Sequence, residues 1–158
     1  YKEAKKMKLT IKQMDLFKSQ RKVLVQCISR DCEMRVGIAK TFDKKFPDMK
    51  SSILTYLDDN TIGYPITVGY ETNDLTVILN MVTKGRYFHK PTYNNFRRAL
   101  ENVKEICIQR GYSEIAMPKI GCGLDGLSWN KIQDIIKEVF KDTDIDILIC
   151  ILQGEQYD

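Results

Sequence analysis

Residues 117–129, which read MPKIGCGLDGLSW, place three glycines within six positions and one carboxylate, Asp125, among them. An apolar run at 115–117 ends in this stretch, and helical spacing of apolar residues follows over 129–140, where Ser128 can cap the helix. A glycine-rich turn between a buried strand and a helix is typical of α/β folds, whose ligands bind beyond the carboxyl ends of the strands.

Strand and helix patterns alternate along the rest of the chain. Short apolar runs rich in β-branched residues predict strands, and apolar residues at helical spacing predict helices. The expected strands are 7–11, 23–28, 66–70, 75–82, 115–117 and 145–152, and the expected helices are 36–46, 53–57, 93–110 (ended by Gly111) and 129–140. This order predicts an α/β fold with a central, mixed and mostly parallel sheet between helices.

The composition fits one compact domain spanning residues 1–158, with a basic N-terminal tail at 1–6. The chain has 158 residues, of which 43% are hydrophobic, and a mild net charge of +4. No run of about 18 apolar residues is present, so no membrane contact is expected, and the start lacks the apolar core of a signal peptide.

The cysteines predict buried free thiols in a reducing compartment, the nucleus or the cytoplasm. They number five, which is odd, and none form a Cys-x-x-Cys pair. A zinc site would need four scattered cysteines, because His89 is the only histidine, so no metal is expected.

Two connections follow predicted strands and lead into helices. One runs from the 23–28 strand to Gly37, and the other covers residues 121–128. Unpaired N–H groups and the dipole at a helix N-terminus favour an anion, and glycines allow close backbone approach, so the second loop suits a phosphate. The alternative is that its glycines only make a tight turn. Neither the P-loop nor the complete dinucleotide fingerprint occurs.

Several blocks together resemble the macrodomain family, in its branch of terminal ADP-ribose protein glycohydrolases, also described as O-acyl-ADP-ribose deacylases. The blocks are VQCISRDCEM at 25–34, GIA at 37–39, TK at 83–84 with HKPTY at 89–93, and MPKIGCGLD at 117–125. Their order and spacing match from about Leu9 to Leu152. The resemblance implies a three-layer α/β/α fold that binds ADP-ribose and needs no cofactor.

The resemblance also implies removal of ADP-ribose from acidic side chains of modified proteins, and deacylation of O-acyl-ADP-ribose. It assigns the nucleophile to Lys84, proton transfer to Asp125 and an adenine contact to Asp15. The further ligand-binding residues expected are Leu16, Cys27, Ile28, Ser29, Gly37, Ile38, Pro118, Ile120, Gly121, Cys122, Gly123 and Leu124.

This chemistry requires that the Lys84 amine be uncharged. Opening of the distal ribose exposes an aldehyde-like carbon, which an uncharged amine attacks to form a Schiff base. A lysine has a reference pKa of about 10.4, so the site must desolvate Lys84 or pass its proton to a base. Asp125 could accept that proton and assist departure of the carboxylate.

Each residue alone also has a plainer interpretation. Lys84 is one of 25 basic residues and could be solvated, and Asp125 could bond to its own turn. We give His89 no catalytic role and expect Tyr93 to start a helix and pack.

Two positions depart from the branch's pattern. Arg35 and Met14 stand where glycines are usual. The Arg35 side chain could clash with a ligand, point outward or pair with a phosphate.

The leading hypothesis is a monomeric hydrolase of ADP-ribosylated proteins. The alternatives are a reader module that binds ADP-ribose without turnover, and a hydrolase of ADP-ribosylated nucleic acid. The mild basicity permits nucleic acid nearby, yet no aromatic and basic stripe supports direct binding.

Overall fold

The structure is a computed structural model that describes residues 5–121 and 125–152. These residues form six strands, four helices and one 3-10 turn. In chain order they are β1 (Lys8–Gln13), η1 (Leu16–Lys18), β2 (Val23–Ser29), α1 (Gly37–Lys45), α2 (Met49–Asp59), β3 (Ile66–Glu71), β4 (Val77–Lys84), α3 (Tyr93–Arg110), β5 (Glu114–Pro118), α4 (Trp129–Phe140) and β6 (Asp146–Ile151).

The six strands form one sheet in the order β1-β6-β5-β2-β4-β3. The neighbouring pairs are parallel except at one edge, where β3 runs antiparallel to β4. This is the mixed, mostly parallel sheet that the sequence predicts. Because five strands run in the same direction, their carboxyl ends meet at a single edge of the sheet.

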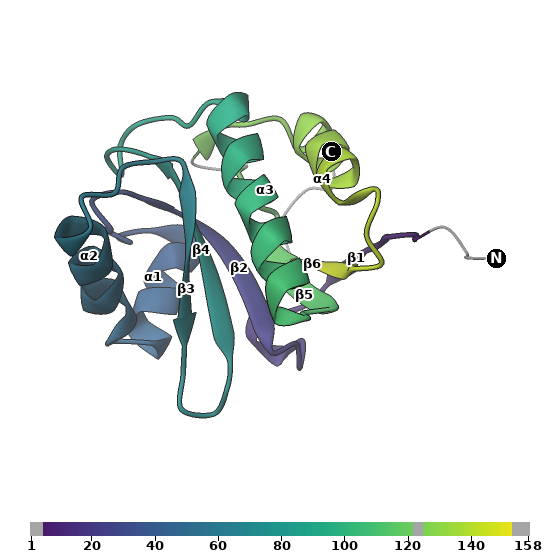
Figure 1. Cartoon of the computed structure of the whole chain (residues 1–158), viewed down its shortest axis with the longest axis horizontal. Coiled ribbons are helices and arrows are strands. Elements are labelled where there is room, and N and C mark those ends of the chain that lie inside the picture. The colour runs from purple at the N-terminus through teal and green to yellow at the C-terminus, as the bar shows by residue number, and fades with distance from the viewer. Residues whose placement is uncertain (1–4, 122–124, 153–158) are drawn as a thin grey trace.

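Helices cover both faces of the sheet, as Figure 1 shows. One core lies between the sheet and α1, α2 and η1, and includes Phe42 and Met49. The other lies between the sheet and α3 and α4, and includes Phe96 and Phe140. The expected three-layer α/β/α architecture is therefore confirmed.

The central strands are buried on both faces, which explains their nearly continuous apolar sequences. In β4 every residue from Val77 to Thr83 is buried. Two buried amides interrupt this pattern, and they bond to each other: Gln26 Nε2 donates to Asn80 Oδ1 at 2.8 Å. This bond satisfies the Gln26 nitrogen and the Asn80 oxygen, while the Gln26 Oε1 atom is buried with no hydrogen-bond partner among the described residues.

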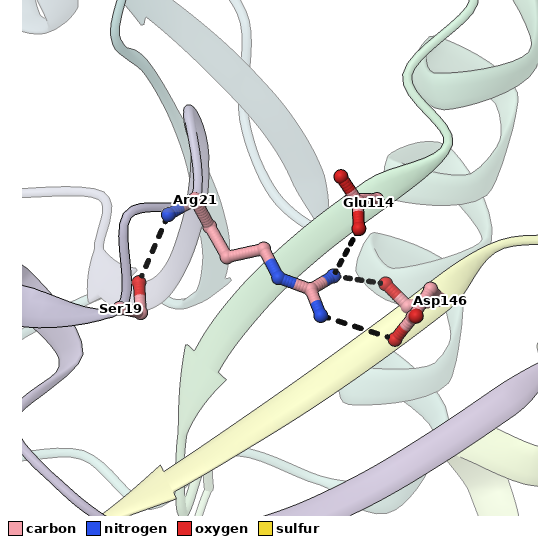
Figure 2. Close-up of polar contacts among 4 residues, drawn as sticks. All are labelled: Ser19, Arg21, Glu114 and Asp146. Atoms are coloured by element: carbon pink, nitrogen blue, oxygen red, sulfur yellow. Dashed lines mark hydrogen bonds and ion pairs between the residues drawn. The ribbon is translucent and has the colours of Figure 1, made fainter.

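The edge of the sheet where the parallel strands begin is held by Arg21, as Figure 2 shows. Its guanidinium donates to the carbonyl oxygen of Asp146 at 3.1 Å and to Asp146 Oδ1 at 3.2 Å, and lies 3.8 Å from Glu114 Oε2. These acids begin β6 and β5, so one side chain from the segment before β2 ties three strands together.

Some boundaries differ from the sequence-based expectation. Helix α2 begins at Met49 rather than at position 53, because polar residues on its exposed side obscured the apolar stripe. Strand β4 begins at Val77 rather than at Leu75, because the turn extends further: Leu75 is 67% exposed, has φ +67° and donates its N–H to Thr72.

Helix ends follow local chemistry only in part. Gly111 ends α3 in the left-handed conformation, as expected, and Tyr93 starts it. Ser128 is the N-cap of α4, but its side chain makes no capping hydrogen bond. Its backbone N–H instead donates to the Tyr93 hydroxyl oxygen at 2.9 Å, which joins α4 to α3.

Part of the expected N-terminal tail, residues 1–4, lies outside the described residues. Lys5 and Lys6 are exposed and without regular structure. Among the described helices, none combines the length and the apolar character needed to cross a membrane.

Candidate active site

Polar and glycine-containing segments gather at the carboxyl edge of the sheet. Asp15 follows β1, Asp31 follows β2, Lys84 ends β4, and Gly121 and Asp125 follow β5. Parallel pairing places all four segments on the same side of the molecule, where α/β proteins bind their ligands.

The central feature of this edge is an ion pair between Lys84 and Asp125. Lys84 Nζ lies 2.6 Å from Asp125 Oδ1. The two side chains are only 13% and 15% exposed. In such a shielded position the charges interact more strongly than on an open surface, and the solvated lysine considered from sequence is ruled out. A proton can pass directly between the two atoms at this separation.

A register shift in the sheet sets the position of Lys84. Ile28 pairs with Val82, but the next residue of β2, Ser29, pairs with Lys84, so Thr83 is an extra residue on β4. Such a bulge re-aims the side chains beside it. The N–H of Arg30 then donates to the Lys84 carbonyl at 2.7 Å and fixes the strand end.

Asp31 joins the segments after β2 and β4. It accepts hydrogen bonds from the Ser29 hydroxyl, from the Tyr87 N–H at 3.1 Å and from the Glu33 N–H at 3.4 Å. Burial raises the pKa of Asp31, but these hydrogen bonds outweigh it, so the pKa lies below its ordinary value. Asp31 is therefore a charged carboxylate, and its hydrogen bonds join the two segments that lie next to Lys84.

Arg35, which stands where the sequence resemblance predicts a glycine, points outward. Its Nε donates to Glu33 Oε2 at 2.8 Å, and its guanidinium carbon lies 4.8 Å from the centre of the Tyr87 ring. The side chain is 57% exposed. Of the orientations considered from sequence, the structure shows the outward one. The guanidinium packs on Tyr87, whose backbone N–H donates to Asp31.

The loop after β5 needs a glycine where it leaves the strand. Gly121 is buried and has φ +75°, which other residues rarely adopt. A Cβ at this position would lie 3.3 Å from Phe96 Cε2 and from Ile132 Cδ1. The glycine thus serves both the turn and the close packing of the loop on α3 and α4.

The remaining predicted ligand residues divide by exposure. Gly37 is exposed at the start of α1, with φ +61° and open space around it, while Ile38, Cys27 and Pro118 are half-buried. Leu16, Ile28, Ser29 and Ile120 are buried as whole residues, with exposed fractions of 2%, 4%, 4% and 3%. Cys122, Gly123 and Leu124 lie outside the described residues.

Asp15 caps the 3-10 turn η1. Its Oδ1 accepts the N–H of Phe17 at 3.0 Å, and the residue is half-buried. Met14, which also stands where the resemblance predicts a glycine, continues the pairing of β1 by donating its N–H to the Ile151 carbonyl. The carboxylate is therefore held at the carboxyl edge, about where β1 and β6 end.

The buried cysteines are poor nucleophiles. Burial raises the pKa of Cys32 to about 11, of Cys107 to about 12 and of Cys150 to about 11. These thiols stay protonated at neutral pH. Within residues 5–121 and 125–152, no group of three or more His, Cys, Asp or Glu side chains could hold a metal ion.

A cavity of about 360 Å³ adjoins Lys84, and sequence reasoning did not assign it. It lies between the end of β4 and the start of α3, and is lined by Tyr64, Thr83, Lys84, Gly85, His89, Lys90, Pro91, Thr92 and Asn95. The sequence signal was the HKPT run directly before a predicted helix, which predicts a helix N-terminus close to the lysine.

The comparisons agree with this geometry. The Macro domain model matches residues 25–136, so the chain belongs to the macro domain family, and the resemblance seen in the sequence is confirmed. More particularly, the chain is 40% identical over 146 residues to the ADP-ribose glycohydrolase OARD1 of Bos taurus, covering 92% of each. It is 40% identical over 129 residues to the Homo sapiens protein of that name, covering 82% of this chain and 81% of that one.

Solved structures share the fold. The macrodomain of Thermus aquaticus DarG superposes with a TM-score of 0.82 at 19% identity, over 91% of this chain and 98% of that one. Thermosipho africanus DarTG in complex with ADP-ribose gives a TM-score of 0.84 at 19% identity, over 96% of this chain and 43% of that one. At 19% sequence identity, this structural similarity is evidence for the fold alone.

Proposed function

We propose that this protein is a hydrolase that removes ADP-ribose from glutamate and aspartate esters of mono-ADP-ribosylated proteins. It also deacylates O-acyl-ADP-ribose, acts as a monomer inside the cell and uses no metal. The observation that carries the proposal is the shielded contact of 2.6 Å between Lys84 Nζ and Asp125 Oδ1. The glycohydrolase name of the relatives that are 40% identical supports it.

Lys84 is the nucleophile, and Asp125 is the neighbouring base that takes its proton. Transfer of one proton along the 2.6 Å contact converts the ammonium and carboxylate into an amine and a carboxylic acid. The amine attacks the ribose carbon that bears the ester, the carboxylate leaves as that carbon–oxygen bond breaks, and opening of the ribose ring converts the adduct into a Schiff base.

Asp125 returns its proton in the same step. The departing carboxylate of the modified side chain needs a proton or a positive neighbour as its bond to the ribose breaks, and the protonated Asp125 supplies that proton. Water hydrolyses the Schiff base, which releases ADP-ribose and restores the amine. The same two groups serve an acyl ester, because its leaving group is also a carboxylate.

The test is release of ADP-ribose from a glutamate-linked, mono-ADP-ribosylated protein. We expect wild type to release it, and Lys84→Ala and Asp125→Ala to lose release by about a hundredfold or more, in the range of lost general acid–base catalysis. Calorimetry on the same samples should show that ADP-ribose still binds. Borohydride should reduce the Schiff base, so that mass spectrometry detects ADP-ribose attached to Lys84 in wild type.

Other outcomes would contradict the proposal. Tight binding without release by wild type would identify a reader module. Release that survives in Lys84→Ala would remove the lysine mechanism, and exclusive action on modified nucleic acid would replace the substrate class.

A further inference from the structure

The cavity beside Lys84 has the chemistry of an anion site. Among the described residues that line it, none is an Asp or a Glu, while Lys90 brings positive charge and Tyr64 and Asn95 bring further donors. The lining therefore offers many hydrogen-bond donors to a group that carries negative charge.

The N-terminus of α3 opens on this cavity. Thr92 and Asn95 both line it, and the Thr92 hydroxyl oxygen accepts the Asn95 N–H at 3.0 Å. Thr92 caps one N–H of this 18-residue helix, but the first turn has no acidic residue, so no negative charge from the helix's own first turn offsets the positive end of its dipole.

A buried hydroxyl in the cavity wall supplies an independent indication of a ligand. Thr83 lines the cavity and is 0% exposed, and within the described part of the chain its Oγ1 has no hydrogen-bond partner. Leaving a buried hydroxyl unpaired destabilises a fold, and a ligand atom in the cavity would supply the missing partner.

Lys90 places a charge between the cavity and the reacting pair. A Cβ built on Gly126, the neighbour of Asp125, would lie 3.6 Å from Lys90 Nζ. Lys90 forms no ion pair with any described carboxylate. Its ammonium is therefore available to bind an anion that is released next to Lys84 and Asp125.

The cavity also depends on a small residue. Gly85 directly follows Lys84, and a Cβ there would lie 3.3 Å from the Tyr64 hydroxyl oxygen and 3.6 Å from His89 Nδ1. A side chain at this position would occupy the space between the two walls.

We propose that this cavity is a subsite for the carboxylate released in the reaction, formed by Lys90, the Thr83 hydroxyl and the N-terminus of α3. This inference rests on the proposed function and names the group that the site accepts besides ADP-ribose. As the bond between the ribose and the acidic side chain breaks, negative charge develops on the carboxylate, and the subsite stabilises that charge.

Direct binding can be tested without turnover. Glutarate, the probe for a free acidic side chain, is titrated into the full chain by ¹H–¹⁵N NMR. Saturable shifts are expected at the amides of Asn94 and Asn95, and the neutral glutaramide should give none. Lys90→Met should weaken glutarate binding by about tenfold, as loss of a charge-assisted hydrogen bond does, while the exposed α4 variant Lys137→Met should not.

Kinetics gives the second readout. On a glutamate-linked substrate, Lys90→Met should lower kcat/KM about tenfold while the Kd for ADP-ribose stays within twofold. Thr83→Val should lower kcat/KM severalfold without lowering the Tm, because it removes a buried unpaired hydroxyl at constant shape. If the Thr83 hydroxyl had only a structural role, its removal would not lower kcat/KM while leaving the Tm unchanged.

The outcomes separate the two proposals. If wild type shows no saturable glutarate shifts, or shows the same shifts in Lys90→Met or with glutaramide, the subsite is overturned whatever the activity. Unchanged kcat/KM in both variants also overturns it. If glutarate binds but wild type releases no ADP-ribose, the proposed function fails, and with it the assignment of this anion site to the leaving group.

Discussion

Lys84 Nζ and Asp125 Oδ1 lie 2.6 Å apart although the residues are 41 positions apart in the chain. Lys84 ends β4, and Asp125 lies in the loop between β5 and α4, with β2 between β4 and β5 in the sheet. The contact therefore forms across a full strand and depends on the loops at the carboxyl edge. This geometry lets a lysine and an aspartate, both common residue types, act together as one acid–base unit.

Such a unit predicts non-additive losses. Lys84→Ala and Asp125→Ala each remove the proton exchange on which the other residue depends, so the double variant should be about as slow as the slower single variant. Single-turnover rates on a glutamate-linked substrate measure this. If the two rate losses multiply in the double variant, the residues act independently and the unit does not exist.

The turn at Gly121 predicts a local cost for any side chain. Gly121→Ala should lower the free energy of unfolding by about 1–3 kcal/mol, because φ +75° is strained and the added Cβ presses on Phe96 and Ile132. Urea unfolding measures the cost, and ADP-ribose affinity should fall with it.

Gly63 provides the matched control for this substitution. It lacks positive φ, and a Cβ there would meet nothing within 4 Å, so Gly63→Ala should leave stability within about 0.5 kcal/mol. Equal stability of the two variants would show that the turn at 121 accepts a side chain.

The pKa of Asp31 predicts a pH-dependent contribution to stability. Because the folded pKa is below that of the unfolded chain, about 3.9, the carboxylate stabilises the fold above that pH, and the contribution is lost as pH falls through the folded value. Asp31→Asn should therefore be less stable than wild type near neutral pH, by on the order of 1 kcal/mol, and the difference should shrink at acid pH.

Unfolding of both proteins in urea between about pH 3 and pH 7 checks this. Asp142→Asn, at an exposed position on the segment after α4, serves as the control. A gap between wild type and Asp31→Asn that stays constant over this range, or that widens toward acid pH, would be inconsistent with a depressed pKa.

The outward orientation of Arg35 predicts that ADP-ribose binding tolerates its loss. Arg35→Ala removes a side chain that is 57% exposed and engaged with Glu33 and Tyr87. The Kd for ADP-ribose should therefore change by less than about threefold, within the range of an exposed ion pair. Calorimetry measures it, and a tenfold or greater loss would mean that the guanidinium turns inward to a phosphate.

Local patterns in the chain determine its strands, its helices and the family blocks that single out Lys84 and Asp125. Continuous apolar runs give the buried strands, helical spacing gives the four helices, and Gly121 marks a turn that only glycine makes without strain. These features depend on neighbours within a few positions, so the sequence contains them.

Tertiary structure alone decides which of these residues meet. The register shift at Thr83 re-aims Lys84, the strand order brings it to Asp125, and the start of α3 forms a cavity with Tyr64 from a distant loop. Arg35 turns outward because Glu33 and Tyr87 receive it. The physical reason is that such contacts depend on strand register and packing across the sheet, which join segments far apart in sequence and leave no local periodic signal.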